Sequence, residues 1–201
     1  VTLFTIYLAL FRRDYFNKPR SIAMLYSLIT LFPVIVAIMM RHNFLSVYIV
    51  PFAMVPMFVR VFMDSRTAFI SHVTMLLICT IAVRYQYEFI IIQIVAGLIA
   101  IYSLRELTRR AQVFKTGILV AMGSALVYLA LQMIQDNDFT IMDHDMYYHF
   151  VVNGVLLLLA YPLMYIVEKM FGFVSSVTLF ELSNTNRGLL RDLSEIAPGT
   201  F

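Results

Sequence analysis

The 201-residue chain is 61% hydrophobic and 13% charged, with a formal net charge of +3. Its mean hydropathy is +0.84, and its apolar share exceeds the roughly 45–50% of soluble domains, so an ordinary soluble fold is excluded and an integral membrane chain is predicted. The single cysteine, Cys79, excludes an intramolecular disulfide. Because the first residue is Val1 and not Met, we expect the chain to be a piece of a longer protein.

Seven apolar runs follow one another along the chain, separated by polar breaks. They cover residues 1–11, 21–40, 44–63, 67–83, 89–104, 116–134 and 150–167. A membrane span needs about 20 residues, so the first run would span only if residues before Val1 continue it. Lone strands leave backbone groups unpaired in lipid, so each run is predicted to be a helix. The predicted fold class is all-α, a polytopic membrane bundle of seven transmembrane helices.

The chain becomes polar after the last run. Two short amphipathic helices are predicted there, and the second has apolar residues at helical spacing, namely Leu189, Leu190, Leu193 and Ile196. Pro198 and Gly199 end that helix. We therefore divide the chain into a transmembrane domain over residues 1–170, with a truncated first helix, and a cytoplasmic helical linker over residues 171–201.

Basic residues fall almost entirely in alternate connections between the runs. Thirteen of the fifteen Lys and Arg belong to one set of connections, and the other set holds only Arg41 and Arg84. Loops rich in Lys and Arg remain in the cytoplasm. The sequence therefore predicts an N-terminus outside the cell and a cytoplasmic C-terminus, in a bilayer.

Polar residues inside the runs are the candidates for intramembrane polar contacts. Arg60 and Asp64 are four residues apart at the end of the third run, and we expect them to pair at the interface. A role in relaying a signal is the alternative. His72, in the fourth run, is interpreted as an interhelical hydrogen-bonding residue in preference to a proton carrier. Asn153 lies inside the seventh run.

Small residues recur at helical spacing in two of the runs. Gly117, Ala121 and Ala125 lie four residues apart in the sixth run, and Ala96 and Ala100 pair in the fifth. Such patterns let helices approach closely. We expect packing within the chain, and a homodimer interface is the alternative.

The end of the chain carries a motif, L-x-E-L-S-x-x-N-x-x-L-L-x-x-L-x-x-x-A-P-G-T-F, that begins at Leu179. It resembles the junction in bacterial seven-transmembrane receptors with an intracellular HD hydrolase, the PgpH-like proteins. Upstream, Pro162, Glu168, Phe171 and Gly172 are similar to that family's exit from its last span. Gly188 stands where the family usually has Pro, and Phe201 where it has Tyr.

The resemblance implies a parent protein that hydrolyses cyclic di-AMP. An extracellular domain would precede these spans, and an HD domain that holds divalent metal, manganese or iron, would follow them. The chain itself shows no catalytic constellation and no metal ligands, so its predicted role is to anchor and regulate that domain. The candidates for signal coupling are Gly188, Leu189, Leu190 and Leu193. A transporter or channel-like bundle is the alternative function.

Overall fold

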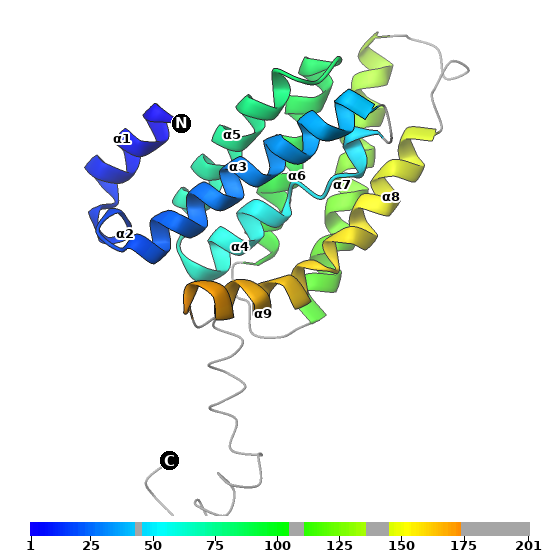
Figure 1. The fold of residues 1–201 in the computed structure, drawn as a ribbon. Helices are drawn as coiled ribbons and strands as arrows, with labels where there is room; N and C mark the ends of the chain where they lie inside the picture. Colours follow the sequence, from blue (N-terminus) through cyan, green and yellow to red (C-terminus); the bar gives the residue numbers. More distant parts are fainter. Residues whose placement is uncertain (43–45, 105–110, 136–144, 174–201) are drawn as a thin grey trace, which may run out of the picture.

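The computed structural model describes residues 1–42, 46–104, 111–135 and 145–173, and this part of the chain is helical with no strand (Figure 1). Its elements in chain order are α1 (Thr2–Phe11), α2 (Arg13–Phe16), α3 (Pro19–His42), the 3₁₀ turn η1 (Val47–Ile49), α4 (Met54–Phe62), α5 (Ser65–Thr80), α6 (Gln86–Ser103), α7 (Ala111–Gln135), α8 (Asp145–Leu157) and α9 (Ala160–Phe171).

The predicted all-α fold is confirmed for the described residues, which contain helices and no strand. The predicted number of seven membrane spans is not shown. Three described helices, α3, α6 and α7, are long and apolar enough to cross a membrane, and the pair α8 and α9, bent by 43°, would make a fourth. Helix α1 has 10 residues and α5 has 16, which at about 1.5 Å per residue is shorter than a hydrocarbon core of about 30 Å. A hydrophobic run therefore did not guarantee a spanning helix.

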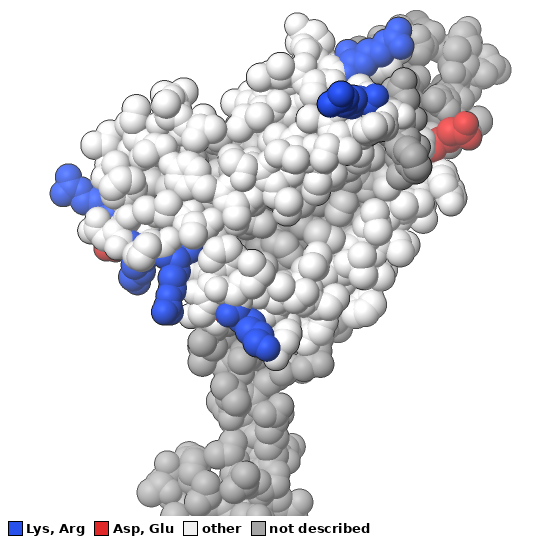
Figure 2. Space-filling view, viewed as in Figure 1, with Lys and Arg blue, Asp and Glu red and all other residues white. Residues whose placement is uncertain are grey.

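The helices pack as neighbours around an apolar core. Helix α6 lies between α5 and α7, α8 packs on α7, and α3 packs on α5. Rings fill the centre: those of Phe52 and Phe89 meet edge to face at 5.2 Å between centroids. On the face drawn in Figure 2, Lys and Arg gather at the two ends and leave uncharged surface between them. That distribution suits a bundle surrounded by lipid.

The third run is interrupted at Pro51, between η1 and α4. Proline removes a backbone donor and disfavours helix in the residue before it, so carbonyls there lose their helical partners. The side-chain amide of Asn153, on α8, donates hydrogen bonds to the carbonyls of Tyr48 and Val50, at 2.9 and 2.8 Å. The predicted intramembrane polar residue thus closes a backbone break across more than a hundred residues of sequence.

The contact between α7 and α8 is made by small residues. A β-carbon on Gly117 would lie 2.9 Å from the carbonyl oxygen of Gly154, and one on Gly154 would lie 2.9 Å from the β-carbon of Ala121. Larger side chains would push these backbones apart. The close packing predicted for Gly117 and Ala121 is confirmed, and it is made within the chain.

Candidate functional site

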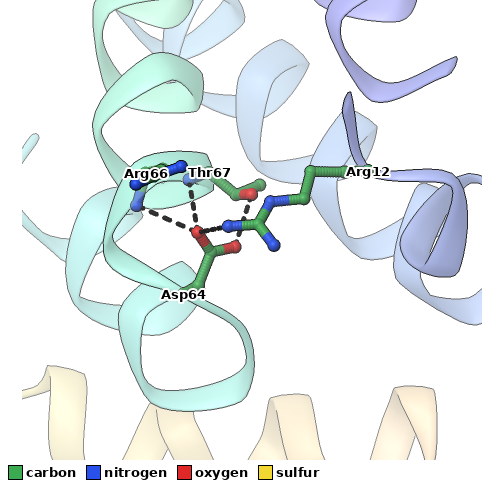
Figure 3. Close-up of polar contacts among 4 residues, drawn as sticks. All are labelled: Arg12, Asp64, Arg66 and Thr67. Carbon is green, nitrogen blue, oxygen red and sulfur yellow. Dashed lines mark hydrogen bonds and ion pairs between the residues drawn. The ribbon is translucent and has the colours of Figure 1, made fainter. Parts of the chain in front are cut away.

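An ion pair joins two distant segments at the end of the bundle that carries α2, the α4–α5 joint and α9, drawn at the bottom of Figure 1 and called the lower end below. The guanidinium Nη2 of Arg12, between α1 and α2, donates to Oδ2 of Asp64 at 2.6 Å (Figure 3). The side chains of Arg12 and Asp64 are 30% and 24% exposed. The pair is therefore partly shielded from water, which strengthens it relative to a fully exposed one.

The same carboxylate is the N-cap of α5. It accepts hydrogen bonds from the backbone N–H groups of Arg66 and Thr67, at 3.1 and 3.3 Å, and from the Thr67 hydroxyl at 2.6 Å (Figure 3). A helix leaves its first N–H groups unpaired, and an Asp at the cap satisfies them. The sequence led us to expect Arg60 as the partner of Asp64; the structure turns the carboxylate toward the start of α5, where it meets Arg12.

Helix α1 is attached to the bundle mainly by a short apolar face. Phe4 and Leu8 are buried, and the hydroxyls of Thr5 and Tyr26 form a hydrogen bond to α3. At the end of α1, the hydrogen bond with Tyr7 and then the negative charge of Asp64 raise the pKa of Arg12, so its guanidinium stays charged. The ion pair thus fixes where α1 ends relative to α5.

The α4–α5 joint also contacts the exit from the last helix. The ring of Phe62, at the end of α4, stacks on that of Phe173 with 5.5 Å between centroids. Gly172 ends α9 in the left-handed conformation, with φ at 68°, and its N–H bonds the carbonyl of Glu168. The two residues that flank Met63 thus make two different contacts. Asp64 pairs with Arg12, at the end of α1, and Phe62 stacks on Phe173, after α9.

The start of α3 approaches that exit as well. Nη1 of Arg20 lies 2.8 Å from the position that a β-carbon on Gly172 would take. A cation near the last carbonyls of a helix is electrostatically favourable. The exit after α9 is therefore held from two sides, by α3 and by α4.

His72 lies apart from this site, inside the bundle. It is fully buried on α5, and its Nε2 donates to the carbonyl of Gln93, on α6, at 2.9 Å. This is the interhelical hydrogen bond expected for His72. The other ring nitrogen has no partner, which fits a neutral imidazole that carries its proton on Nε2.

The candidates for signal coupling are the remaining predicted residues. Gly188, Leu189, Leu190 and Leu193 lie outside the described residues. Within the described ranges, no group of three or more His, Cys, Asp and Glu could hold a metal ion. Sequence reasoning missed the Arg12–Asp64 pair and the Phe62–Phe173 stack, because no local pattern links residues so far apart.

Comparison with known families decides the relationship of the chain. The model of the family described as "7TM receptor with intracellular HD hydrolase" matches residues 1–175. The chain belongs to this family. The helices described above are thus the membrane part of a receptor-like architecture, and the resemblance of the chain to this family is confirmed.

Two curated relatives carry the name cyclic-di-AMP phosphodiesterase PgpH. The chain is 28% identical to the protein of Bacillus subtilis over 198 residues, which cover 92% of the chain and 28% of the relative. It is 24% identical to that of Listeria monocytogenes over 160 residues, which cover 77% of the chain and 22% of the relative. The chain thus spans about a quarter of the relatives' length. No solved structure matches the chain.

Proposed function

We propose that this chain is the membrane domain of a bacterial phosphodiesterase that hydrolyses cyclic di-AMP, and that it regulates the catalytic HD domain as well as anchoring it. The observation that carries the proposal is the family match over residues 1–175. The names of the two relatives give the substrate. The proposed boundaries are residues 1–170 for the membrane domain and 171–201 for the linker.

The hydrolytic chemistry belongs, in this proposal, to the HD domain that follows the linker. That domain would hold a divalent metal, manganese or iron, which lowers the pKa of bound water and so supplies the attacking hydroxide. The described residues offer no comparable ligand set. What this chain would contribute is the position of the catalytic domain relative to the membrane.

The proposed route of regulation runs through the lower end of the bundle. A displacement of α1 would pull on Asp64 through Arg12 and thereby on the α4–α5 joint. Phe62, at the same joint, would pass the displacement to Phe173 and the exit from α9. Leu189, Leu190 and Leu193 would dock on the HD domain, with Gly188 at the start of their helix. This order of contacts couples both ends of the chain.

The test is hydrolysis of cyclic di-AMP by the full-length parent in nanodiscs, with manganese. Asp64→Asn keeps an N-cap and loses the ion pair, while Phe62→Leu loses the ring stack. Each should change the rate, whereas the isolated HD domain, which lacks these residues, sets the unregulated rate. Lys18→Gln, a charge removal at an exposed residue between α2 and α3, is the control.

The result separates regulation from anchoring. If both variants hydrolyse at the wild-type rate, the membrane domain only anchors. If the wild-type parent itself hydrolyses no cyclic di-AMP with manganese or iron, the proposed activity is wrong. Leu190→Ser with Leu193→Ser then tests the linker: altered rate in the parent, with an unaltered isolated HD domain, supports docking.

We further propose a location in the bacterial plasma membrane, with the N-terminus outside and the lower end of the bundle in the cytoplasm. The support is the placement of Lys and Arg in alternate connections. Partners in this arrangement would be the lipid bilayer, an extracellular domain before α1, and the HD domain with its cyclic dinucleotide. A homodimer of the parent would be compatible with it.

One feature of the structure favours the alternative function of a transporter, and another argues against it. Two interrupted helices exist, η1 with α4 and α8 with α9, and transporters use such breaks to expose backbone groups to substrate. Here, however, the side-chain amide of Asn153 donates hydrogen bonds to the carbonyls of Tyr48 and Val50. The break is closed by the protein's own side chain, which favours a structural role.

A further inference from the structure

Helix α9 has an apolar face that the bundle does not cover. Four exposed apolar side chains recur every three or four residues, beginning at the N-cap of the helix: Leu159, Leu163, Ile166 and Met170. This spacing places them on one side of a helix. Ala160 and Met164 are buried on the other side, where α9 packs on α3 and α4. A row of exposed apolar side chains of this kind marks a contact with lipid or with another protein surface.

The position of α9 brings this face to the lower end of the bundle. Helix α9 is bent by 43° from α8. At the bend, the N–H groups of Leu159 and Tyr161 bond carbonyls only three residues back, and Pro162 follows, which has no N–H to donate. The helix then lies across the lower end (Figure 1). In the proposed orientation, that end meets the inner leaflet of the membrane.

Two cationic side chains adjoin the apolar face at the end of α9. Lys169 is exposed in the last turn of the helix. Arg20 is exposed at the start of α3, and its Nη1 lies 2.8 Å from the position that a β-carbon on Gly172 would take. Residues three apart are neighbours on a helix surface, and Lys169 comes three residues before Gly172. The two cations therefore lie on the same side of the helix end.

The protein leaves the charge of these two cations uncompensated. In the described part of the chain, neither Arg20 nor Lys169 forms an ion pair. The first turn of α3 holds no acidic residue, and Glu168, the acidic residue of α9, is half-buried. On the face drawn in Figure 2, Lys and Arg at the lower end border uncharged surface. A cationic edge beside an apolar face suits a molecule with an anionic head and an apolar tail.

We propose that this corner binds an anionic phospholipid of the inner leaflet. Arg20 and Lys169 hold its phosphate, the guanidinium through paired hydrogen bonds and the ammonium as a point charge. An acyl chain follows Met170, Ile166 and Leu163. The inference goes beyond the proposed phosphodiesterase, because it concerns lipid binding by the 201-residue chain alone.

The charges also argue against a second copy of the chain as the occupant. In a two-fold symmetric dimer the same patch of both subunits meets. Contact through this corner would bring Arg20 and Lys169 of each copy close to those of the other, and like charges across an interface repel. An anionic headgroup offers the complementary charge, and the bilayer supplies it at high local concentration.

The test uses tryptophan fluorescence, because the chain contains no tryptophan. Met170→Trp places one on the apolar face of the full 201-residue chain in phosphatidylcholine nanodiscs. A small fraction of the lipid is phosphatidylglycerol or phosphatidylcholine brominated on an acyl chain, which quenches tryptophan on contact. Phosphatidylglycerol should bind about fivefold more tightly or better, the effect of one basic residue near an anionic surface. Leu126→Trp, exposed on α7, whose only basic residue is Lys115, should show no preference.

Charge variants in the Met170→Trp background locate the headgroup. Arg20→Gln with Lys169→Gln should abolish the preference for phosphatidylglycerol and leave quenching by phosphatidylcholine intact. Lys169→Gln alone should lower the preference severalfold, whereas Arg20→Lys with Lys169→Arg should retain it. Arg41→Gln with Arg84→Gln removes two exposed arginines from the opposite end of the bundle and is the matched control. A preference that survives the loss of Arg20 and Lys169 would overturn the proposal.

Acrylamide, a water-soluble quencher, separates the other possible coverings of α9. It should quench Met170→Trp weakly compared with Tyr87→Trp, at a residue that is 85% exposed at the start of α6. Strong quenching at both positions would show that the face of α9 is open to water. Shielding of Met170→Trp from acrylamide and from both brominated lipids would show that protein covers it. Equal quenching by the two lipids would show lipid contact without a headgroup site, and each of these three results contradicts the proposal.

Discussion

The imidazole of His72 occupies the space that a side chain on Gly97 would need. A β-carbon on Gly97 would lie 2.3 Å from both Cδ2 and Nε2 of the ring, and Nε2 is fixed by its hydrogen bond to the carbonyl of Gln93. The ring therefore cannot move aside without losing that bond. Helices α5 and α6 approach one another through a histidine that fits only against a glycine.

Gly97→Ala should therefore destabilise the bundle. The added methyl meets a rigid, hydrogen-bonded ring, and overpacking of this kind costs about 1–3 kcal/mol. The midpoint of thermal unfolding in detergent should fall accordingly. Gly123→Ala is the matched control, because its methyl would clash with Cδ1 of Ile99 alone, the far end of a flexible side chain, with Cγ1 at an ordinary contact distance, and should cost less.

A double variant checks the cause. His72→Ala with Gly97→Ala should be less destabilised than the sum of the single changes, since the clash is absent once the ring is gone. Additive losses would show that the two residues do not interact through space.

Asn153→Leu should destabilise the third and seventh apolar runs together. The change removes the amide donors to the carbonyls of Tyr48 and Val50. The Val50 carbonyl keeps its bond from the N–H of Phe52, so the Tyr48 carbonyl is the group left unsatisfied, at a cost of about 1–3 kcal/mol. Asn153→Asp should be as harmful, because a carboxylate offers no donor. Thermal unfolding measures both. Gln132→Leu, whose amide bonds only a tyrosine hydroxyl in the described structure, should be milder, and equal losses would contradict the proposed closure of the break.

Substitutions at Asp64 should separate its two roles. Asp64→Asn retains an N-cap for α5 and loses only the ion pair, which contributes little at a partly exposed site. Asp64→Ala loses the cap too, for a further ~1 kcal/mol. The expected order of thermal stability is wild type, then Asn, then Ala. If Arg12→Gln further destabilises the Asn variant as much as it does wild type, the two residues are not coupled.

Hydropathy predicted the helices well and their lengths poorly. Each apolar run does contain helix, because a run of apolar side chains in lipid has no better way to pair its backbone. Where a run breaks depends on long-range compensation. Pro51 marks the break in the third run of the sequence, but only the position of Asn153 on α8 explains how the carbonyl of Tyr48 is satisfied.

The candidate site was harder to predict for a related reason. Arg60 and Asp64 satisfy the helical pairing rule, but Asp64 lies past the end of α4 and caps the next helix. Its guanidinium partner comes from a segment 52 residues earlier. In the sequence, Gly172 is similar to a position of the family's exit from its last span. Its left-handed conformation explains why a glycine is suited to that position.

Labelling of single cysteines should test the orientation. In a Cys79→Ser background, Tyr87→Cys and Arg13→Cys place thiols on two exposed residues at opposite ends of the bundle. The charge distribution places Tyr87 outside, so an impermeant thiol reagent on intact cells should label that position alone. Arg13→Cys should react only after the membrane is opened. Labelling in the reverse order would overturn the proposed topology.

Gly172→Ala should alter the way the chain leaves the last helix. With φ at 68°, a residue with a β-carbon pays about 1 kcal/mol or more in this conformation, and the new methyl would also crowd Nη1 of Arg20. The segment after α9 would then shift away from Phe62. Thermal stability should fall modestly, and hydrolysis of cyclic di-AMP by the parent in nanodiscs should change. Gly172→Asn places the same β-carbon beside Arg20 but tolerates the left-handed conformation, so it is the control for the backbone effect. If the Ala variant loses stability while its hydrolysis matches that of wild type and the Asn variant, the exit geometry does not control the catalytic domain.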